Sequence, residues 1–273
     1  MNPHMPSFAT ITFEEVEPQI ALVKLNRPDT LNAMNMDMLD DFGRLFEILS
    51  ADDSIRVVIL AGNGRGFSSG ADLNDAVSHS DSEAFSDPET FLKLVQEKYS
   101  ALITGLRGIP QPVIAAVNGA AAGGGFCLAL ASDIRIAADN AYFVASFINI
   151  GLSGGELGSS YLLPRLVGLS RAADILCTGR KVDAFEADRI GLVSAVVPQE
   201  NLLAKALEYA RMMTGKSVGG LKLTKRVLQQ NIDSPSLGSA IELENRNQTI
   251  LLFSGDFFRL IKSFATKHDD GFT

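Results

Sequence analysis

Residues 109–137 read IPQPVIAAVNGAAAGGGFCLALASDIRIA and place three kinds of local structure in succession. The apolar run Pro112–Val117 predicts a buried strand, and Phe126–Ala131 predicts a buried helix. Between them lie Asn118-Gly119 and a glycine triplet, Gly123–Gly125, where the lack of side chains lets a ligand approach the backbone. The free N–H groups at the start of a helix can also face a negative oxygen. The stretch therefore predicts a strand, a backbone-lined anion site and a helix.

The glycine triplet also has a structural interpretation as a tight packing point or a flexible turn, and the local sequence leaves both open. A membrane-spanning helix is excluded, because Asn118 and four glycines interrupt the apolar run and Asp133 and Arg135 follow it. A span needs ~20 consecutive apolar residues.

Composition is typical of a globular protein, with 273 residues, 46% hydrophobic and 21% charged. The net charge is −8 and no basic cluster stands out, so we expect neither a nucleic acid nor a membrane as partner. Two scattered cysteines, Cys127 and Cys177, predict reduced thiols. The first ten residues lack the basic and apolar regions of a secretory signal, so a cytoplasmic location is expected.

Alternating and helically spaced apolar residues predict the elements that precede the glycine triplet. The polar segment Asp75–Pro88 is expected to form a mobile loop, a candidate lid over a ligand. The expected strands are Phe8–Glu14, Ile20–Leu25 and Arg56–Ala61, and the expected helices are Met36–Leu49 and Thr90–Leu106.

After the triplet, short strands give way to helices. This order of strand–strand–helix units followed by helices predicts an α/β core over residues 1–198 and a C-terminal helical region over residues 199–273. Large apolar side chains crowd the terminal segment, which is expected to pack on the core or on another subunit. The expected strands are Tyr142–Ile150 and Val193–Val197, and the expected helices are Tyr161–Leu166, Arg171–Cys177, Ala184–Ile190, Leu202–Met213, Leu221–Asn231 and Leu237–Phe264.

Two G-x-S-x-G matches, Gly66–Gly70 and Gly151–Gly155, resemble the nucleophile elbow of serine hydrolases. That chemistry needs a histidine partner, and the chain offers only His4, His79 and His268, in the termini and a polar loop. The glycines are therefore better explained as turn formers. No dinucleotide or P-loop motif occurs, and no cysteine or histidine cluster has metal-ligand spacing, so no metal is expected.

Two strand-to-turn junctions remain, at Ser69–Leu73 and Ala122–Gly125. Each offers backbone N–H groups, and two such donors converging on one carbonyl oxygen would form an oxyanion hole. The sequence alone leaves their convergence open.

Several segments together resemble the crotonase superfamily, also known as the enoyl-CoA hydratase/isomerase superfamily. GFSSGADL is similar to its first fingerprint, and PVIAAVNGAAAGGGFCLALASDIRIAA is similar to its second. NRPDTLNAMN, SSYLLPRLVG and RKVDAFEADRIGLVSAVVP resemble the flanking segments, so the likeness covers residues 8–265. It implies a spiral of repeated ββα units, a C-terminal helical trimerisation region, and a homotrimer or dimer of trimers.

The resemblance also implies an acyl-CoA thioester as substrate, with no cofactor other than its coenzyme A. The backbone N–H groups of Ala71 and Gly124 would hold the thioester oxygen, and the Ser69 carbonyl would face the adenine. Further residues implied to line the coenzyme A groove are Ala33, Asp72 and Leu73.

The departures from the family pattern bear on the reaction. Family hydratases carry two glutamates that activate and deliver water, and here Cys127 and Phe147 occupy those positions. Cys127 is expected to pack in an apolar helix, where a thiol is inert. Glu156 remains as a candidate acid/base, close to the place where dienoyl-CoA isomerases of the superfamily use an aspartate. Its alternative role is that of a helix N-terminal glutamate that complements the helix dipole.

We therefore expect an acyl-CoA enzyme that stabilises a thioester enolate, with isomerase-like or specialised chemistry. Two alternatives stay open: an enoyl-CoA hydratase with Glu156 as its lone acid/base, and a catalytically degenerate acyl-CoA binding protein.

Overall fold

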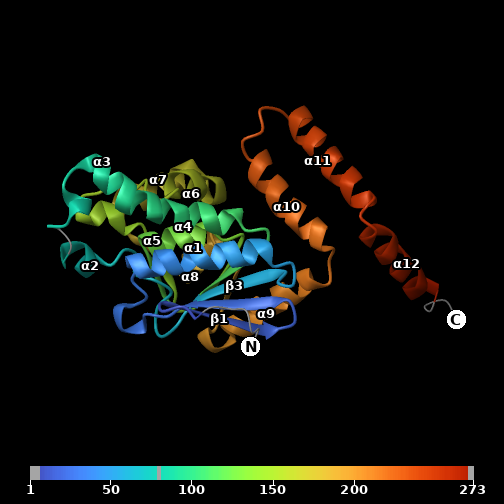
Figure 1. Cartoon of the computed structure of the whole chain (residues 1–273), viewed down its shortest axis with the longest axis horizontal. Coiled ribbons are helices and arrows are strands. Elements are labelled where there is room, and N and C mark those ends of the chain that lie inside the picture. The colour runs from blue at the N-terminus through green and yellow to red at the C-terminus, as the bar shows by residue number, and fades with distance from the viewer. Residues whose placement is uncertain (1–6, 79–80, 270–273) are drawn as a thin grey trace. The chain divides into compact units, whose positions relative to one another are not determined.

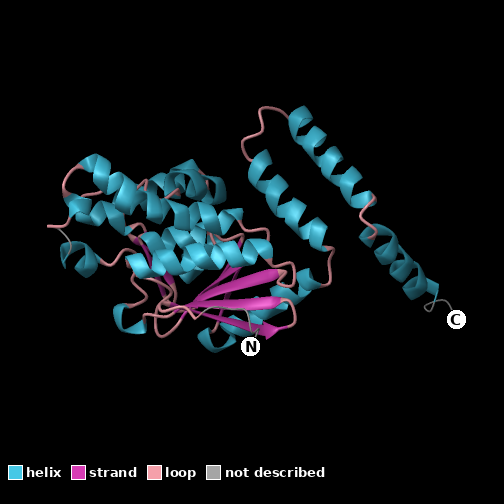
Figure 2. Ribbon diagram, in the orientation of Figure 1, coloured by secondary structure: helices cyan, strands magenta, loops and turns pink. Residues whose placement is uncertain are grey.

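The structure is a computed structural model that describes residues 7–78 and 81–269, without the side chains of residues 75–76 and 263–269. It divides into two compact units, Met1–Arg211 and Met212–Thr273. The first unit is a mixed α/β structure, and the second consists of helices (Figures 1 and 2).

A six-stranded sheet forms the centre of the first unit (Figure 2). Its first two strands form an antiparallel hairpin, and every later pair is parallel. The parallel strands read as continuous apolar runs because both faces are covered. In sheet order the strands are β1 (Ile11–Glu17), β2 (Ile20–Leu25), β3 (Val57–Gly62), β4 (Val113–Val117), β6 (Ile134–Ala138) and β9 (Ala195–Val197).

A second sheet of three short strands was not predicted. It contains β5 (Ala120–Ala122), β7 (Tyr142–Val144) and β8 (Lys181–Asp183), in that order. Of the short strands predicted within Tyr142–Ile150, only β7 forms, because a 3-10 helix, Ser146–Ile150, follows and carries Phe147. Three-residue strands are too short to show alternation in the sequence.

Helices α1 (Met36–Ala51), α4 (Glu97–Gly108) and α5 (Gly124–Ala131) lie over the large sheet (Figure 1). Asn35 caps α1, because its side chain accepts a hydrogen bond from Met38 N at 3.2 Å. All eight residues of α5 are buried, which explains its uniformly apolar sequence. The buried face of α1 is Met38, Leu39, Asp41, Phe42, Leu45, Phe46 and Leu49.

The segment between β3 and α4 differs from its prediction. The predicted loop Asp75–Pro88 includes part of α2 (Leu73–Ser78), a 3-10 turn (Glu83–Phe85) and the first residue of α3 (Pro88–Phe91). Its residues 79–80 lie outside the described residues, and its ordering over a ligand stays a prediction. The predicted helix Thr90–Leu106 is interrupted by a π-helical turn, Leu92–Gln96, before α4 begins.

Residues 199–211 belong to the first unit, although the sequence prediction placed them in the helical region. In α9 (Leu202–Thr214), Leu202, Ala206 and Ala210 are buried, and Arg211 Nε donates to Glu17 Oε2 of β1 at 2.9 Å. The other elements are 3-10 turns at Pro28–Thr30 and Gln199–Asn201 and the helices α6 (Ser159–Val167), α7 (Leu169–Thr178) and α8 (Ala184–Arg189).

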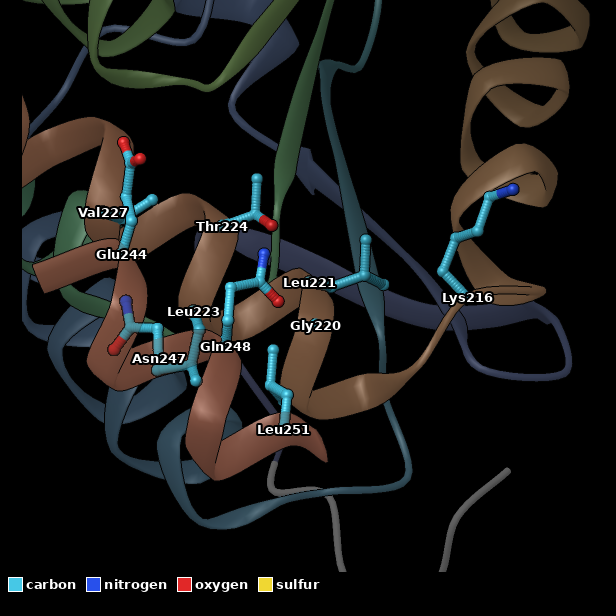
Figure 3. A pocket seen from close by; sticks show the side chains of 10 residues that line it. All are labelled: Lys216, Gly220, Leu221, Leu223, Thr224, Val227, Glu244, Asn247, Gln248 and Leu251. Carbon is cyan, nitrogen blue, oxygen red and sulfur yellow. The ribbon is translucent and has the colours of Figure 1, made fainter. Parts of the chain in front are cut away.

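The second unit contains α10 (Val218–Asn231), α11 (Leu237–Leu252) and α12 (Asp256–Asp269). The single helix predicted over Leu237–Phe264 is wrong, because the chain turns at Gly255, whose φ is +80°. A cavity of about 350 Å³ lies between α10 and α11 (Figure 3). Its lining mixes Leu221, Val227 and Leu251 with polar side chains, among them Thr224 and Gln248.

Candidate active site

Two glycine-rich segments lie side by side at the carboxyl ends of β3 and β4. Ser68 pairs with Ala121 in a parallel bridge, in which Ser68 N donates to Ala120 O at 2.9 Å and Ala122 N donates to Ser68 O at 2.9 Å. The ends of neighbouring parallel strands meet at one sheet edge, so the two junctions singled out in the sequence come together here.

The N–H of Ala71 points away from its neighbouring strand segment. Met34 pairs with Ala71, and Met34 N donates to Gly70 O at 2.8 Å. The C=O and N–H of one trans peptide point in opposite directions, so the N–H of the Gly70–Ala71 peptide faces the other side. No described residue accepts a hydrogen bond from this N–H.

The N–H of Gly124 is the first of α5, and the first-turn N–H groups of a helix have no partner within the helix. Among the described residues it donates no hydrogen bond, whereas Gly123 N donates to Val144 O at 2.9 Å. A Cβ added to Gly70 would lie 3.0 Å from Gly124 N. The two donors are therefore neighbours, held by backbone pairing and close glycine packing.

Both donors open into a cavity of about 620 Å³. Most of its wall is apolar, and apolar surroundings strengthen the electrostatic effect of the donors. The lining residues are Asn35, Met36, Asp37, Ala71, Asp72, Leu73, Ser82, Ala84, Phe85, Phe91, Leu94, Val95, Gln96, Tyr99, Gly124, Phe147, Ile150, Leu152, Glu156 and Leu157.

Glu156 lines the same cavity and is half-buried. Its backbone is fixed on both sides, because Glu156 N donates to Ser159 Oγ at 3.0 Å and Ser159 N donates to Glu156 O at 2.9 Å. Leu157 then adopts a φ of +48°, a strained value for a leucine, and Gly158 caps α6. Glu156 thus precedes the helix cap, and its carboxylate belongs to the cavity wall.

Asp72, Leu73 and Phe147 also line this cavity, as the predicted substrate contacts would. Asp72 is paired with Arg27 at 2.8 Å, and Arg27 Nη1 also donates to Ala33 O at 2.6 Å. This ion pair ties the turn that carries Ala71 to the loop before α1, and it partly neutralises a carboxylate beside the oxyanion donors.

The structure does not bring every candidate into the cavity wall. Ala33 is buried beneath it, and Ser69 is bonded to the loop before α1, with Ser69 Oγ donating to Thr30 O at 3.2 Å. Cys127 is fully buried in α5, and its Sγ donates to Glu156 O at 3.4 Å. Burial first, and the nearby Glu156 carboxylate second, raise the pKa of the Cys127 thiol.

The G-x-S-x-G serines stabilise turns. Ser68 is buried, donates to Asn32 O at 2.8 Å and accepts from Gly70 N at 3.2 Å. Ser153 Oγ accepts from Gly155 N at 3.1 Å. His4, His79 and the side chain of His268 lie outside the described residues.

Sequence reasoning missed several cavity residues between α2 and α4. Gln96 Nε2 donates to Glu156 Oε1, and Tyr99 OH donates to Met34 O at 2.8 Å. The rings of Phe85 and Phe91 lie 5.1 Å apart by their centroids, tilted by 57°, and add apolar surface to the cavity wall. The sequence signal for Phe91, Gln96 and Tyr99 was the predicted helix Thr90–Leu106, which does not show what that helix covers. Phe85 lies in the segment that was predicted as a polar loop.

The paired amides beside a largely apolar cavity form a site that could hold a carbonyl oxygen. The sequence profile of the enoyl-CoA hydratase/isomerase family matches residues 15–273, so the chain belongs to this family of the crotonase superfamily and is an enzyme of that type. The resemblance and the fold class inferred from the sequence are confirmed.

Two curated relatives and one solved structure illustrate the range of the family. A probable enoyl-CoA hydratase of Mycobacterium bovis, echA12, is 45% identical over 96% of this chain and 92% of its own length. The 1,2-epoxyphenylacetyl-CoA isomerase of Escherichia coli is 35% identical over 94% of this chain and 96% of its own. A monofunctional enoyl-CoA isomerase structure from Mycobacterium smegmatis is 47% identical, with a TM-score of 0.72, over 85% of this chain and 98% of its own.

Proposed function

We propose that this protein isomerises unsaturated acyl-CoA thioesters, with Glu156 as the proton carrier. The Ala71 and Gly124 N–H groups hold the thioester oxygen. The observation that carries the proposal is that the Glu156 carboxylate lines the same apolar cavity as these two donors. Asp37 and Asp72 also line this cavity, and Asp72 is held in an ion pair with Arg27.

The reaction moves one proton and shifts one double bond. The Glu156 carboxylate removes a proton from the carbon next to the thioester, and the electron pair of that C–H bond delocalises onto the thioester oxygen as an enolate. The protonated Glu156 then returns its proton to a more distal carbon while the enolate collapses. The product is an isomer of the substrate, and Glu156 is again ionised.

The enolate is the species that the backbone donors stabilise. Its charge develops on an oxygen facing two N–H groups that are already in place, so no reorganisation is required when the charge forms. Removing one such donor costs about 3–4 kcal/mol of transition-state stabilisation. The largely apolar wall increases the strength of each hydrogen bond.

Isomerisation is preferred to hydration because of the two replaced glutamates. Phe147 presents an apolar ring to the cavity, and Cys127 is buried beneath the wall with a raised thiol pKa. Neither can activate a water molecule. A single carboxylate suffices for removal and return of one proton, whereas the hydratase pattern uses two.

The substrate follows from the same cavity. A wall with Phe85, Phe91, Leu94, Phe147 and Leu152 suits an apolar acyl group. The coenzyme A portion is proposed to follow the segment carrying Ala33, Ser69 and Asp72. The reaction requires no cofactor beyond that coenzyme A, because only a proton and a π bond move.

Replacement of Glu156 with Gln tests the proposal. We expect turnover of a 3-enoyl-CoA to fall by at least about a hundredfold, with acyl-CoA affinity retained, because Gln cannot carry the proton. Glu89→Gln is the matched control, since Glu89 is 76% exposed and pairs with Lys93. Unchanged turnover in Glu156→Gln would refute the proposal.

Mass spectrometry of the products in D₂O separates the alternatives. Isomerisation gives a product of substrate mass, apart from exchanged deuterium, whereas hydration adds one water. A hydrated product lost in Glu156→Gln would instead support a hydratase with a lone acid/base. Tight acyl-CoA binding without turnover of any 2-enoyl, 3-enoyl or dienoyl ester would support a binding protein.

We also propose that the protein assembles as a homotrimer or a dimer of trimers through its C-terminal helices. The second unit exposes large apolar side chains, with Ile250, Phe253 and Phe258 each more than half exposed. Exposed apolar surface of this kind marks an association site. A monomeric mass in light scattering would exclude this assembly. No helix in the described part of the chain has the length and apolarity to cross a bilayer.

A further inference from the structure

Gln96 reaches the Glu156 carboxylate from a distant part of the chain. The two residues are 60 positions apart in the sequence, and Gln96 Nε2 donates to Glu156 Oε1. Both side chains are half-buried and line the same cavity. The contact therefore lies within the proposed site and joins the α3–α4 segment to the turn before α6.

A π-helical turn places Gln96 there. The segment Leu92–Gln96 is wider than the α-helix that follows it, and Gln96 is its last residue. One inserted residue rotates the preceding side chains relative to α4, and such bulges frequently occur at functional sites. Val95 of this turn is buried, whereas Leu92 and Leu94 are exposed.

The other hydrogen bonds of Glu156 involve its backbone, so its carboxylate is free to accept one from Gln96. Ser159 bonds the backbone N–H and C=O of Glu156, and Cys127 Sγ donates to its carbonyl. Among the described residues, Gln96 is the side chain that bonds the Glu156 carboxylate. A carboxylate in an apolar cavity needs such a donor, because an unpaired charge there is costly.

A carboxamide can serve both protonation states of its partner. Its NH₂ group donates to an ionised carboxylate, and its C=O accepts from a protonated carboxyl after rotation about the terminal bond. A lysine or arginine at this place would donate only and would oppose protonation of the carboxyl. The Gln96 amide matches a group that must gain and lose a proton in each cycle.

We propose that Gln96 is a positioning residue that holds Glu156 toward the acyl cavity through both halves of the proton transfer. This inference rests on the proposed function of Glu156. The inference also gives the π-helical turn a role. Through Gln96, the turn sets the direction in which the Glu156 carboxylate points, without contact with the reacting carbons.

Replacement of Gln96 with Met keeps the length and removes the hydrogen bond. We expect kcat to fall by about tenfold to a hundredfold, because a misplaced catalytic group loses reactivity steeply. KM should change little, since the oxyanion donors and the apolar wall are intact. Lys93→Met is the matched control in the same π-helical turn, as Lys93 is 62% exposed and outside the cavity wall.

Replacement of Gln96 with Glu gives a second, pH-dependent readout. As pH falls, the two carboxyls first take up one shared proton and can hydrogen-bond to each other, whereas at higher pH the two like charges repel. Relative to the unchanged protein, activity of Gln96→Glu should therefore be best retained at acidic pH and decline as pH rises. The other titratable residues that line the cavity are Asp37, Asp72 and Tyr99. They are the same in the unchanged protein and in Gln96→Glu, so they do not account for a difference between the two pH profiles.

The outcomes distinguish this inference from the function on which it rests. Wild-type kcat and pH profile in both Gln96 variants, with Glu156→Gln inactive, would overturn the role of Gln96 alone. A KM increase with unchanged kcat would also overturn it, because that result indicates substrate contact. Full activity in Glu156→Gln would remove the proposed function itself.

Discussion

Gly70 lies against Gly124 so closely that a Cβ on Gly70 would stand 3.0 Å from the Gly124 amide nitrogen and 2.8 Å from Ala122 O. Gly70 also has a φ of +93°, which disfavours any other residue. Together with the Ser68–Ala121 pairing, this contact makes the Ala71 and Gly124 N–H groups neighbours on the cavity wall.

Gly70→Ala should therefore separate the two donors. We expect kcat/KM to fall by about 10²–10³, the loss typical of one oxyanion donor. Gly191→Ala is the control for backbone strain, because Gly191 has a φ of +77° but its nearest neighbour, Leu166 O, would lie 3.9 Å from a new Cβ. Similar activity losses in both variants would show that strain, rather than donor geometry, is responsible.

Two helical glycines give opposite predictions for stability. A Cβ on Gly43 of α1 would meet nothing within 4 Å, whereas one on Gly105 of α4 would lie 2.6 Å from a Phe46 ring carbon. Gly43→Ala should raise the free energy of unfolding by about 0.5–1 kcal/mol. Gly105→Ala should lower it by about 1–3 kcal/mol through overpacking. Denaturant unfolding measures both, and a stabilising Gly105→Ala would contradict the packing of α1 on α4.

Asp41 should make stability depend on pH. Its side chain is 2% exposed and accepts hydrogen bonds from Ala9 N at 3.0 Å and from Thr10 N and Oγ1 at 2.8 and 2.7 Å. Burial alone would raise the pKa of the Asp41 carboxyl, but these bonds and Arg44 outweigh it and hold the pKa below its usual range. The carboxylate thus adds stability above the unfolded-state pKa of ~3.9, and this stability is lost as pH falls through the folded-state pKa.

Asp41→Asn should lower the free energy of unfolding by about 2–3 kcal/mol at pH 7 and by less below about pH 4. Asp40→Asn is the neighbouring control, because Asp40 is 58% exposed and its pair with Lys98 contributes at most about 1 kcal/mol. Equal losses for Asp41→Asn at pH 3 and pH 7 would show that its charge is not responsible.

Cys127 should resist alkylation in the folded protein. Its thiol is fully buried with a raised pKa, whereas Cys177 is exposed. Iodoacetamide at pH 8 is expected to label Cys177 alone, because thiolate content and access control reactivity. Peptide mass spectrometry reads out both sites, and comparable labelling of Cys127 would contradict its place beneath the cavity wall.

The sequence by itself determined the elements with strong local patterns. Strand β2 occupies Ile20–Leu25 as predicted, and α1 extends the predicted helix Met36–Leu49 by two residues. The two glycine-rich junctions were also readable from the residues, whereas the candidacy of Glu156 came from the resemblance to the family. Short strands such as β8 left none, because three residues show no periodicity.

Only the tertiary structure decided what those local features do together. The register that pairs Ser68 with Ala121 sets the approach of the two amides, and no local pattern encodes a pairing between segments so far apart. The same holds for Gln96, whose contact with Glu156 depends on a π-helical turn inside a helical pattern. Sequence periodicity reports which face of a segment is buried, whereas long-range backbone pairing selects the residues that meet across a cavity.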